Sequence, residues 1–175
     1  MMTRTLKATC VATIAWLSAS MACSAAFAHD GTDLEVANIP PPPAALVQLE
    51  TARASTARFR DVDQAEHEGY VDIGVFVPNM GWHYLKQSLL DDRFDFANPE
   101  LLVYADDPCG GKRQLVAVEY AVPLAESRNA PSGFIGRADT WEVNAEFGLW
   151  TLHAWIWEYN TAGVFAPLNP FVASP

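Results

Sequence analysis

Three polar side chains lie in segments of the sequence that are otherwise apolar, and these residues are the best placed to do chemistry. They are His83 in Met80–Leu85, Glu119 in Leu115–Val122 and His153 in Trp150–Tyr159. An ionised carboxylate among apolar side chains is costly unless a positive or hydrogen-bonding group meets it, so we expect Glu119 to lie against both histidines. Two imidazoles and one carboxylate are a ligand set for zinc, non-haem iron or manganese.

The three residues are far apart in the sequence, and three interpretations of them stay open. They could hold a divalent metal, form a buried hydrogen-bonded network without a ligand, or line a metal-free pocket for a small molecule. A strand's period of two puts Trp155 and Trp157 on the face of His153, and Trp82 directly precedes His83. We therefore expect Trp82, Trp155 and Trp157 to line a ligand pocket around the polar set.

Other candidate ligands have simpler interpretations. His29 would begin the chain after removal of an export signal and could offer its amine and imidazole to copper, but a histidine after small residues is ordinary at such cleavage points. His67 lies where a predicted helix ends, and we interpret it as a cap residue. Six acidic residues lack the spacing of a calcium loop and predict a solvated acidic surface: Asp91, Asp92, Asp95, Glu100, Asp106 and Asp107.

The elements that must position these residues are one helix and about five strands. Ala44–Glu68 predicts a single amphipathic helix that Gly69 ends, because its apolar residues recur at helical spacing. Alternating apolar, β-branched and aromatic residues predict strands at 70–77, 81–87, 101–105, 114–123 and 148–159. This order predicts an α+β domain over 44–175, with the N-terminal helix packed on a curved, mostly antiparallel sheet.

The first residues predict export to the periplasm or the cell exterior. Arg4 and Lys7 precede the apolar stretch Cys10–Leu17, and Ala26-Phe27-Ala28 is a small-x-small cleavage pattern. We expect a signal peptide over 1–28, cleaved near Ala28 and His29, followed by a flexible Pro-rich leader over 29–43. No later segment approaches the length of a membrane span.

The charge of the chain narrows the class of partner. There are 11 basic and 21 acidic side chains, and loss of residues 1–28 would remove two basic residues and no acidic one. A chain this acidic is a poor partner for nucleic acid or for an anionic membrane surface. Cys109 would be the one cysteine left after cleavage, which excludes an intramolecular disulfide.

Three segments together resemble a family of exported bacterial proteins that has no established activity. They are Met80-Gly81-Trp82-His83-Tyr84, Val118–Pro123, and Leu152–Trp157 continuing to Gly163–Pro170. The resemblance spans about residues 50–170 and implies export but no reaction. Family members tend to have a proline where this chain has Thr161 and a cysteine near the position of Phe76. The resemblance therefore implies a disulfide to Cys109 in relatives, for which this chain lacks the partner cysteine.

The sequence therefore predicts an exported protein that binds a small molecule or a divalent metal, with His83, Glu119 and His153 as its inward-facing polar set. One alternative is a metal-dependent enzyme that uses the same residues, with Glu119 as ligand or general base. The other is a structural module that forms homo-oligomers through its aromatic strand.

Overall fold

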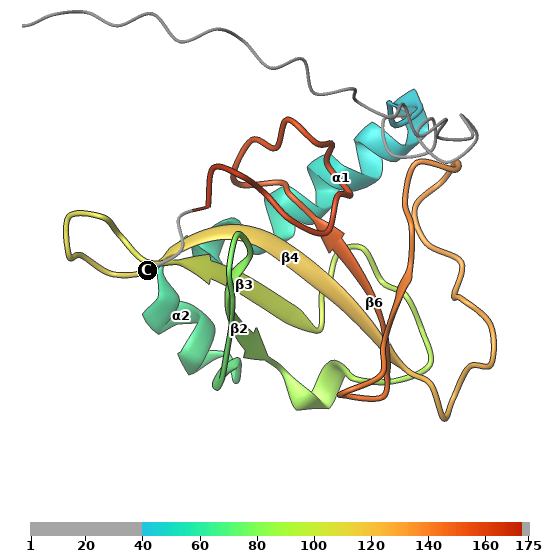
Figure 1. The fold of residues 1–175 in the computed structure, drawn as a ribbon, viewed down its shortest axis with the longest axis horizontal. Coiled ribbons are helices and arrows are strands. Elements are labelled where there is room, and N and C mark those ends of the chain that lie inside the picture. Colours follow the sequence, from blue (N-terminus) through green and yellow to red (C-terminus); the bar gives the residue numbers. More distant parts are fainter. Residues whose placement is uncertain (1–39, 173–175) are drawn as a thin grey trace, which may run out of the picture. The chain divides into compact units, whose positions relative to one another are not determined.

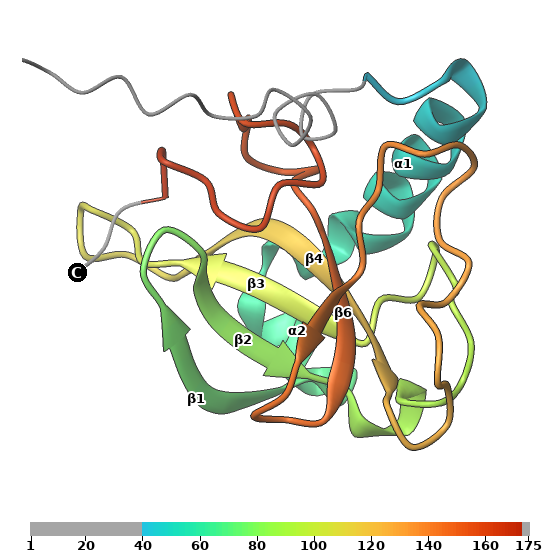
Figure 2. The same cartoon turned by 45° about the vertical axis from the view of Figure 1, so that its right-hand side comes forward.

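In the computed structural model, which describes residues 40–172, a curled antiparallel sheet is covered on one side by helices (Figures 1 and 2). The expected signal peptide and residues 29–39 of the expected leader lie outside the described residues. The helical segments are α1 (Pro43–Thr56), η2 (Ala57–Arg60), α2 (Val62–His67) and η3 (Gln87–Leu89). The strands are β1 (Val71–Val77), β2 (Gly81–Leu85), β3 (Leu101–Ala105), β4 (Gln114–Pro123), β5 (Glu142–Asn144) and β6 (Leu149–Ala154).

The α+β class is confirmed, and the sheet has six strands where about five were expected. Their order is β1-β2-β3-β4-β6-β5, and every neighbouring pair is antiparallel. The additional strand, β5, has 3 residues and pairs only with β6, so it is too short to produce a sequence pattern of its own. The expected bounds of β3 and β4 are confirmed.

The prediction of one continuous helix over 44–68 is wrong. Helix α1 begins at Pro43, since proline suits the first helical position, and ends at Thr56, whose hydroxyl bonds back to the Ala52 carbonyl at 2.7 Å. Asp61 then adopts an extended conformation, and its side chain accepts from the backbone N–H of Asp63 as the cap of α2. The break lets Phe59 turn into the core, where it is 3% exposed.

The expected last strand, 148–159, ends earlier, at Ala154. Beyond this residue the backbone N–H of Trp155 bonds to the Val164 carbonyl at 2.8 Å, and that of Trp157 bonds to the Val116 carbonyl at 3.2 Å. The strand pairing therefore stops after Ala154, and the face of a side chain further along, such as Trp157, can no longer be read from its position in the sequence.

The sheet has two buried faces of different character. The helix face packs against α1 and α2 and carries large side chains: Tyr84, Leu102, Tyr104, Val118, Tyr120 and Leu152. The opposite face, called here the inner face, carries smaller and polar side chains: His83, Val103, Ala117, Glu119, Thr151 and His153. The three candidate residues thus share one face because each pairs with, or lies two positions from, another inner-face residue.

The segment after β6 folds back over the end of the sheet. The backbone N–H of Asn169 donates to the Asn79 carbonyl in the turn between β1 and β2 at 2.8 Å, and the Asn169 amide donates to the Tyr159 carbonyl at 3.0 Å. Asn169 is fully buried. No helix within residues 40–172 is long and apolar enough to cross a membrane.

A substitution at Gly81, at the start of β2, tests how closely β2 packs against β3. The φ of Gly81 is +122°, and a Cβ there would collide with the Tyr104 carbonyl group of the neighbouring strand. We expect Gly81→Ala to lower the free energy of unfolding by more than about 3 kcal/mol. The matched control is Gly110→Ala, whose Cβ would meet nothing within 4 Å at φ +78° and should cost only about 1 kcal/mol. Urea unfolding followed by tryptophan fluorescence measures both, and equal costs would contradict this account.

Candidate metal centre

His83, Glu119 and His153 meet on the inner face, as the sequence predicted. Strands β2, β4 and β6 each supply one of them, and one ligand atom from each residue lies within 4.8 Å of those of the other two. All three side chains are buried. Glu119 and His153 are direct partners across β4 and β6, whereas His83 reaches the pair from the far side of β3.

The curl of the sheet brings the two histidines together. Their strands are separated by β3 and β4, which in a flat sheet would place them about 14 Å apart. Their ring centroids are instead 6.4 Å apart. The inner face is therefore the concave one, and its small residues Val103 and Ala117 leave the space that the imidazoles fill.

The orientation of His83 is set by strand β1. Its Nδ1 lies 3.2 Å from the Val75 carbonyl, which can only accept, so Nδ1 carries the proton. A bulge between Asp72 and Phe76 shifts the register of β1 against β2 beside this carbonyl. The Nε2 atom of a neutral His83 then turns its lone pair towards Oε2 of Glu119, 3.5 Å away. A backbone carbonyl that fixes the tautomer of a ligand histidine is a common second layer around metals.

Burial governs the protonation of the other two residues. It raises the pKa of Glu119, and the nearby His83 together with a hydrogen bond from the Thr151 hydroxyl offset part of this effect. Burial also lowers the pKa of His153 to about 4, so its ring is neutral at physiological pH, which is the form that binds metals.

His153 also carries an unsatisfied polar atom. Its Nε2 is buried and has no hydrogen-bond partner among residues 40–172. The closest carboxylate oxygen is Oε1 of Glu119 at 3.4 Å, which is long for a hydrogen bond. Buried polar atoms almost always have a partner, so this atom indicates that a further group belongs between the three side chains.

The separations between these atoms fit a metal ion. For bonds of about 2.1 Å, the ligand atoms of a tetrahedral site lie about 3.4 Å apart. His83 Nε2 lies 3.5 Å from Oε2 of Glu119, and His153 Nε2 lies 3.4 Å from Oε1, so each imidazole meets a different oxygen of the carboxylate. One ligand atom from each of the three residues lies within 4.8 Å of the other two. A metal held by these residues would be bound by one imidazole nitrogen from each of His83 and His153 and one or both oxygens of Glu119.

The three tryptophans do not surround the polar set as expected. Trp155 packs with Met80, Val103 and Ala117 on the inner face. Trp82 and Trp157 pack on the helix face, so the prediction that they line the same pocket is wrong. Trp82 alternates with His83 along β2, and Trp157 lies beyond the end of β6, where the strand period no longer applies.

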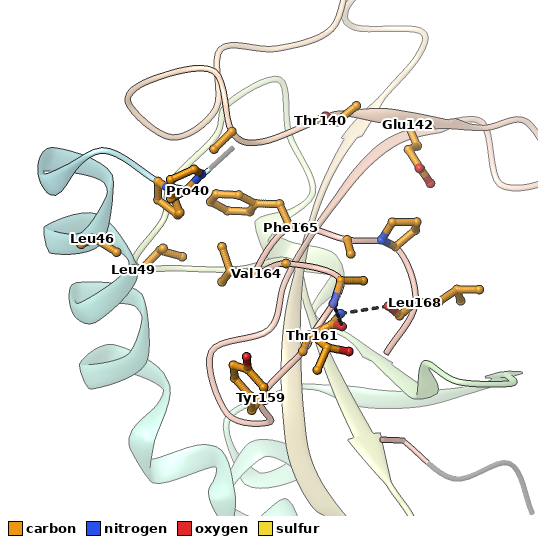
Figure 3. Close-up of a pocket in the computed structure, with 17 residues that line it drawn as sticks. Pro40, Leu46, Leu49, Thr140, Glu142, Tyr159, Thr161, Val164, Phe165 and Leu168 are labelled. Atoms are coloured by element: carbon orange, nitrogen blue, oxygen red, sulfur yellow. Dashed lines mark hydrogen bonds between the residues drawn. The ribbon is translucent and has the colours of Figure 1, made fainter. Parts of the chain in front are cut away.

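A cleft with a volume of about 800 Å³ lies elsewhere, between α1 and the segment after β6 (Figure 3). Leu46 and Leu49 of α1 face Val164 and Phe165 across it. None of the three polar residues lines this cleft, nor do Trp82, Trp155 and Trp157. The metal-ligand set and this cleft are therefore separate features.

Of the other histidines, His67 ends α2 with an exposed side chain, as a cap residue should, and His29 lies outside the described residues.

Glu100 differs from the solvated residue that we expected. It is only 3% exposed, and its carboxylate accepts from the backbone N–H of Ala121 at 3.0 Å. Glu100 directly precedes the apolar run Leu101–Ala105, and this position is the signal from which its burial could have been predicted.

Comparison with known proteins finds no relative of this chain. The chain matches no family model, no curated protein and no solved structure. The resemblance to exported bacterial proteins of the segments around His83, Glu119 and His153 stays a prediction, and the case for a function rests on the site itself.

The buried Glu100 predicts how stability depends on pH. Burial raises its pKa from 4.5 to about 8 in the folded protein, so the unfolded chain ionises first. The neutral Glu100 side chain therefore makes its full contribution to the free energy of unfolding below about pH 4.5. This contribution is lost as the pH rises towards 8. Between pH 5 and pH 9 the wild-type protein should lose about 3 kcal/mol more than Glu100→Gln does. Urea unfolding at both pH values measures this, with the exposed Glu146→Gln as control, and parallel pH profiles for Glu100→Gln and wild type would refute it.

Proposed function

We propose that this protein binds one divalent metal ion through His83, Glu119 and His153. The observation that carries the proposal is the buried Nε2 of His153, which has no partner among residues 40–172 and faces a carboxylate and a second imidazole. Zinc, manganese and ferrous iron all accept two imidazoles and one carboxylate, and the chemistry of the donors does not select one of them.

A ligand-free hydrogen-bonded network explains these observations less well. Such a network would bring each imidazole nitrogen to about 2.7–2.9 Å from the carboxylate, since one partner or both would be charged. The two separations, 3.5 and 3.4 Å, are longer by at least half an ångström. They match the edges of a metal's coordination shell, in which the ligand atoms face one ion and not each other.

The burial of the site favours holding a metal over turning over a substrate. Three protein ligands leave a coordination position open, as in catalytic zinc sites. However, neither the cleft beside α1 nor a second cavity that Arg53, Arg60 and Trp157 line includes any of the three side chains. The metal-dependent enzyme would need an approach for its substrate, whereas a bound ion needs only to join β2, β4 and β6 across the concave face.

Metal addition tests the proposal directly. Protein stripped with a chelator should bind one equivalent of zinc or manganese, and the midpoint of thermal unfolding should rise with metal concentration. His83→Ala and His153→Ala should each weaken binding at least about 100-fold, because each removes one of three ligands. The matched control is His67→Ala, an exposed histidine outside the site, which should bind as wild type does. Calorimetric titration gives both stoichiometry and affinity, and wild-type protein that binds no metal would end the proposal.

Glu119→Gln separates a metal ligand from a residue that only supports the core. Without metal, this substitution removes a buried carboxylate whose pKa is raised, so the variant should be at least as stable as wild type at pH 8. With excess zinc the order should reverse, since only the wild type retains its full ligand set. Denaturant unfolding with and without zinc measures this. A large loss of stability without metal would instead support the hydrogen-bonded network.

A further inference from the structure

Two arginines converge on one tryptophan at the helix face, away from the metal-ligand set. The guanidinium carbon of Arg53 lies 4.5 Å from the ring centre of Trp157, and that of Arg60 lies 5.5 Å from it. Such stacking places two positive charges beside one indole. All three side chains line a second cavity of about 580 Å³.

The indole and one of the guanidinium groups are held in place. The Nε1–H of Trp157 donates to the Thr56 hydroxyl at 3.1 Å, at the end of α1. The Arg53 guanidinium donates to the Ile156 carbonyl, in the residue before Trp157. Arg60 ends η2, directly before the extended residue that separates the two helices. Arg60 therefore reaches the indole that Arg53 also contacts from the η2 segment, just before the break between the two helices.

The charges of these two arginines are not neutralised by the described protein. Arg58 pairs with Glu68 and Arg113 pairs with Asp72, but neither Arg53 nor Arg60 forms an ion pair within residues 40–172. Two guanidinium groups with free donors around a polar cavity are suited to bind an oxyanion, because their N–H groups match its oxygens.

We propose that Arg53, Arg60 and Trp157 form a binding site for the carboxylate or phosphate group of a small anionic molecule. The amide of Gln114 lines the same cavity and adds a neutral donor. Two carboxylates also line it. Asp61 is paired with Lys112 at 3.3 Å, which leaves Glu158 as the carboxylate that opposes an anion.

The anion site is independent of the proposed metal. Trp157 packs with the helix-face core, whereas the metal ligands lie on the inner face of the same sheet. Anion binding measured on protein stripped of metal therefore tests this inference whether or not the metal proposal holds.

The experiment follows the Trp157 indole N–H in protein with nitrogen-15-labelled tryptophan. Sodium phosphate and, separately, sodium acetate are titrated into metal-free protein at constant ionic strength, and Trp157→Phe assigns the resonance. We expect a saturable shift of this resonance with at least one probe. A response to phosphate alone would define a phosphate site, and a response to acetate as well would define a general carboxylate and phosphate site; both support the inference.

Variants decide whether the two arginines are responsible. Arg53→Gln and Arg60→Gln should each weaken binding about ten-fold, and Glu158→Gln should strengthen it about three-fold by removing the opposing charge. The matched control is Arg128→Gln, which removes the same charge from an exposed residue outside the cavity and should change affinity less than two-fold. A shift that does not saturate, or equal effects of the Arg60 and Arg128 substitutions, would overturn the inference.

Discussion

The structure depends on one constraint: a carboxylate and two imidazoles must share a space closed off from water. Glu119 is buried, so its charge would be costly without hydrogen-bonding or positive neighbours. The curl of the sheet offsets this cost because it brings His83, on the far side of β3, to the Glu119–His153 pair. Register shifts in β1 against β2 and in β3 against β4 supply local curvature, as β-bulges do.

The helix face has the opposite character and makes the curl rigid. Its tyrosines are large, and three of them donate their hydroxyls to backbone carbonyls of distant segments: Tyr70 to Pro99 at 2.7 Å, Tyr104 to Phe59 at 2.6 Å and Tyr120 to Phe96 at 2.9 Å. Each bond ties a loop or helix to the apolar core while satisfying a buried polar group. Bulky side chains on the convex side and small ones on the concave side together define the direction of bending.

Sequence patterns predicted those parts of this molecule that local periodicity determines. Strand β3 is apolar throughout, and between Gln114 and Pro123 the one polar residue of β4 is Glu119, so the bounds of both strands were clear. The isolated carboxylate then indicated the two histidines as its partners. The break at Asp61 depends on Phe59 entering the core, and the early end of β6 depends on bonds from Trp155 and Trp157 to Val164 and Val116. Those contacts are between residues distant in sequence, so no local pattern could predict them. The wrong placement of Trp157 follows from the same cause, and so does the failure to foresee the arginine pair around it.

The contact between Asn169 and the turn at Asn79 has a consequence for how the chain reaches this shape. The turn that joins the first two strands is made early during synthesis, but the amide that caps it comes from one of the last described residues. One end of the concave surface therefore closes only when a segment about 90 residues later in the chain folds back onto this turn. Loop closure over such a distance is entropically slow. The interior would remain accessible during that interval, which is when an ion could enter most easily.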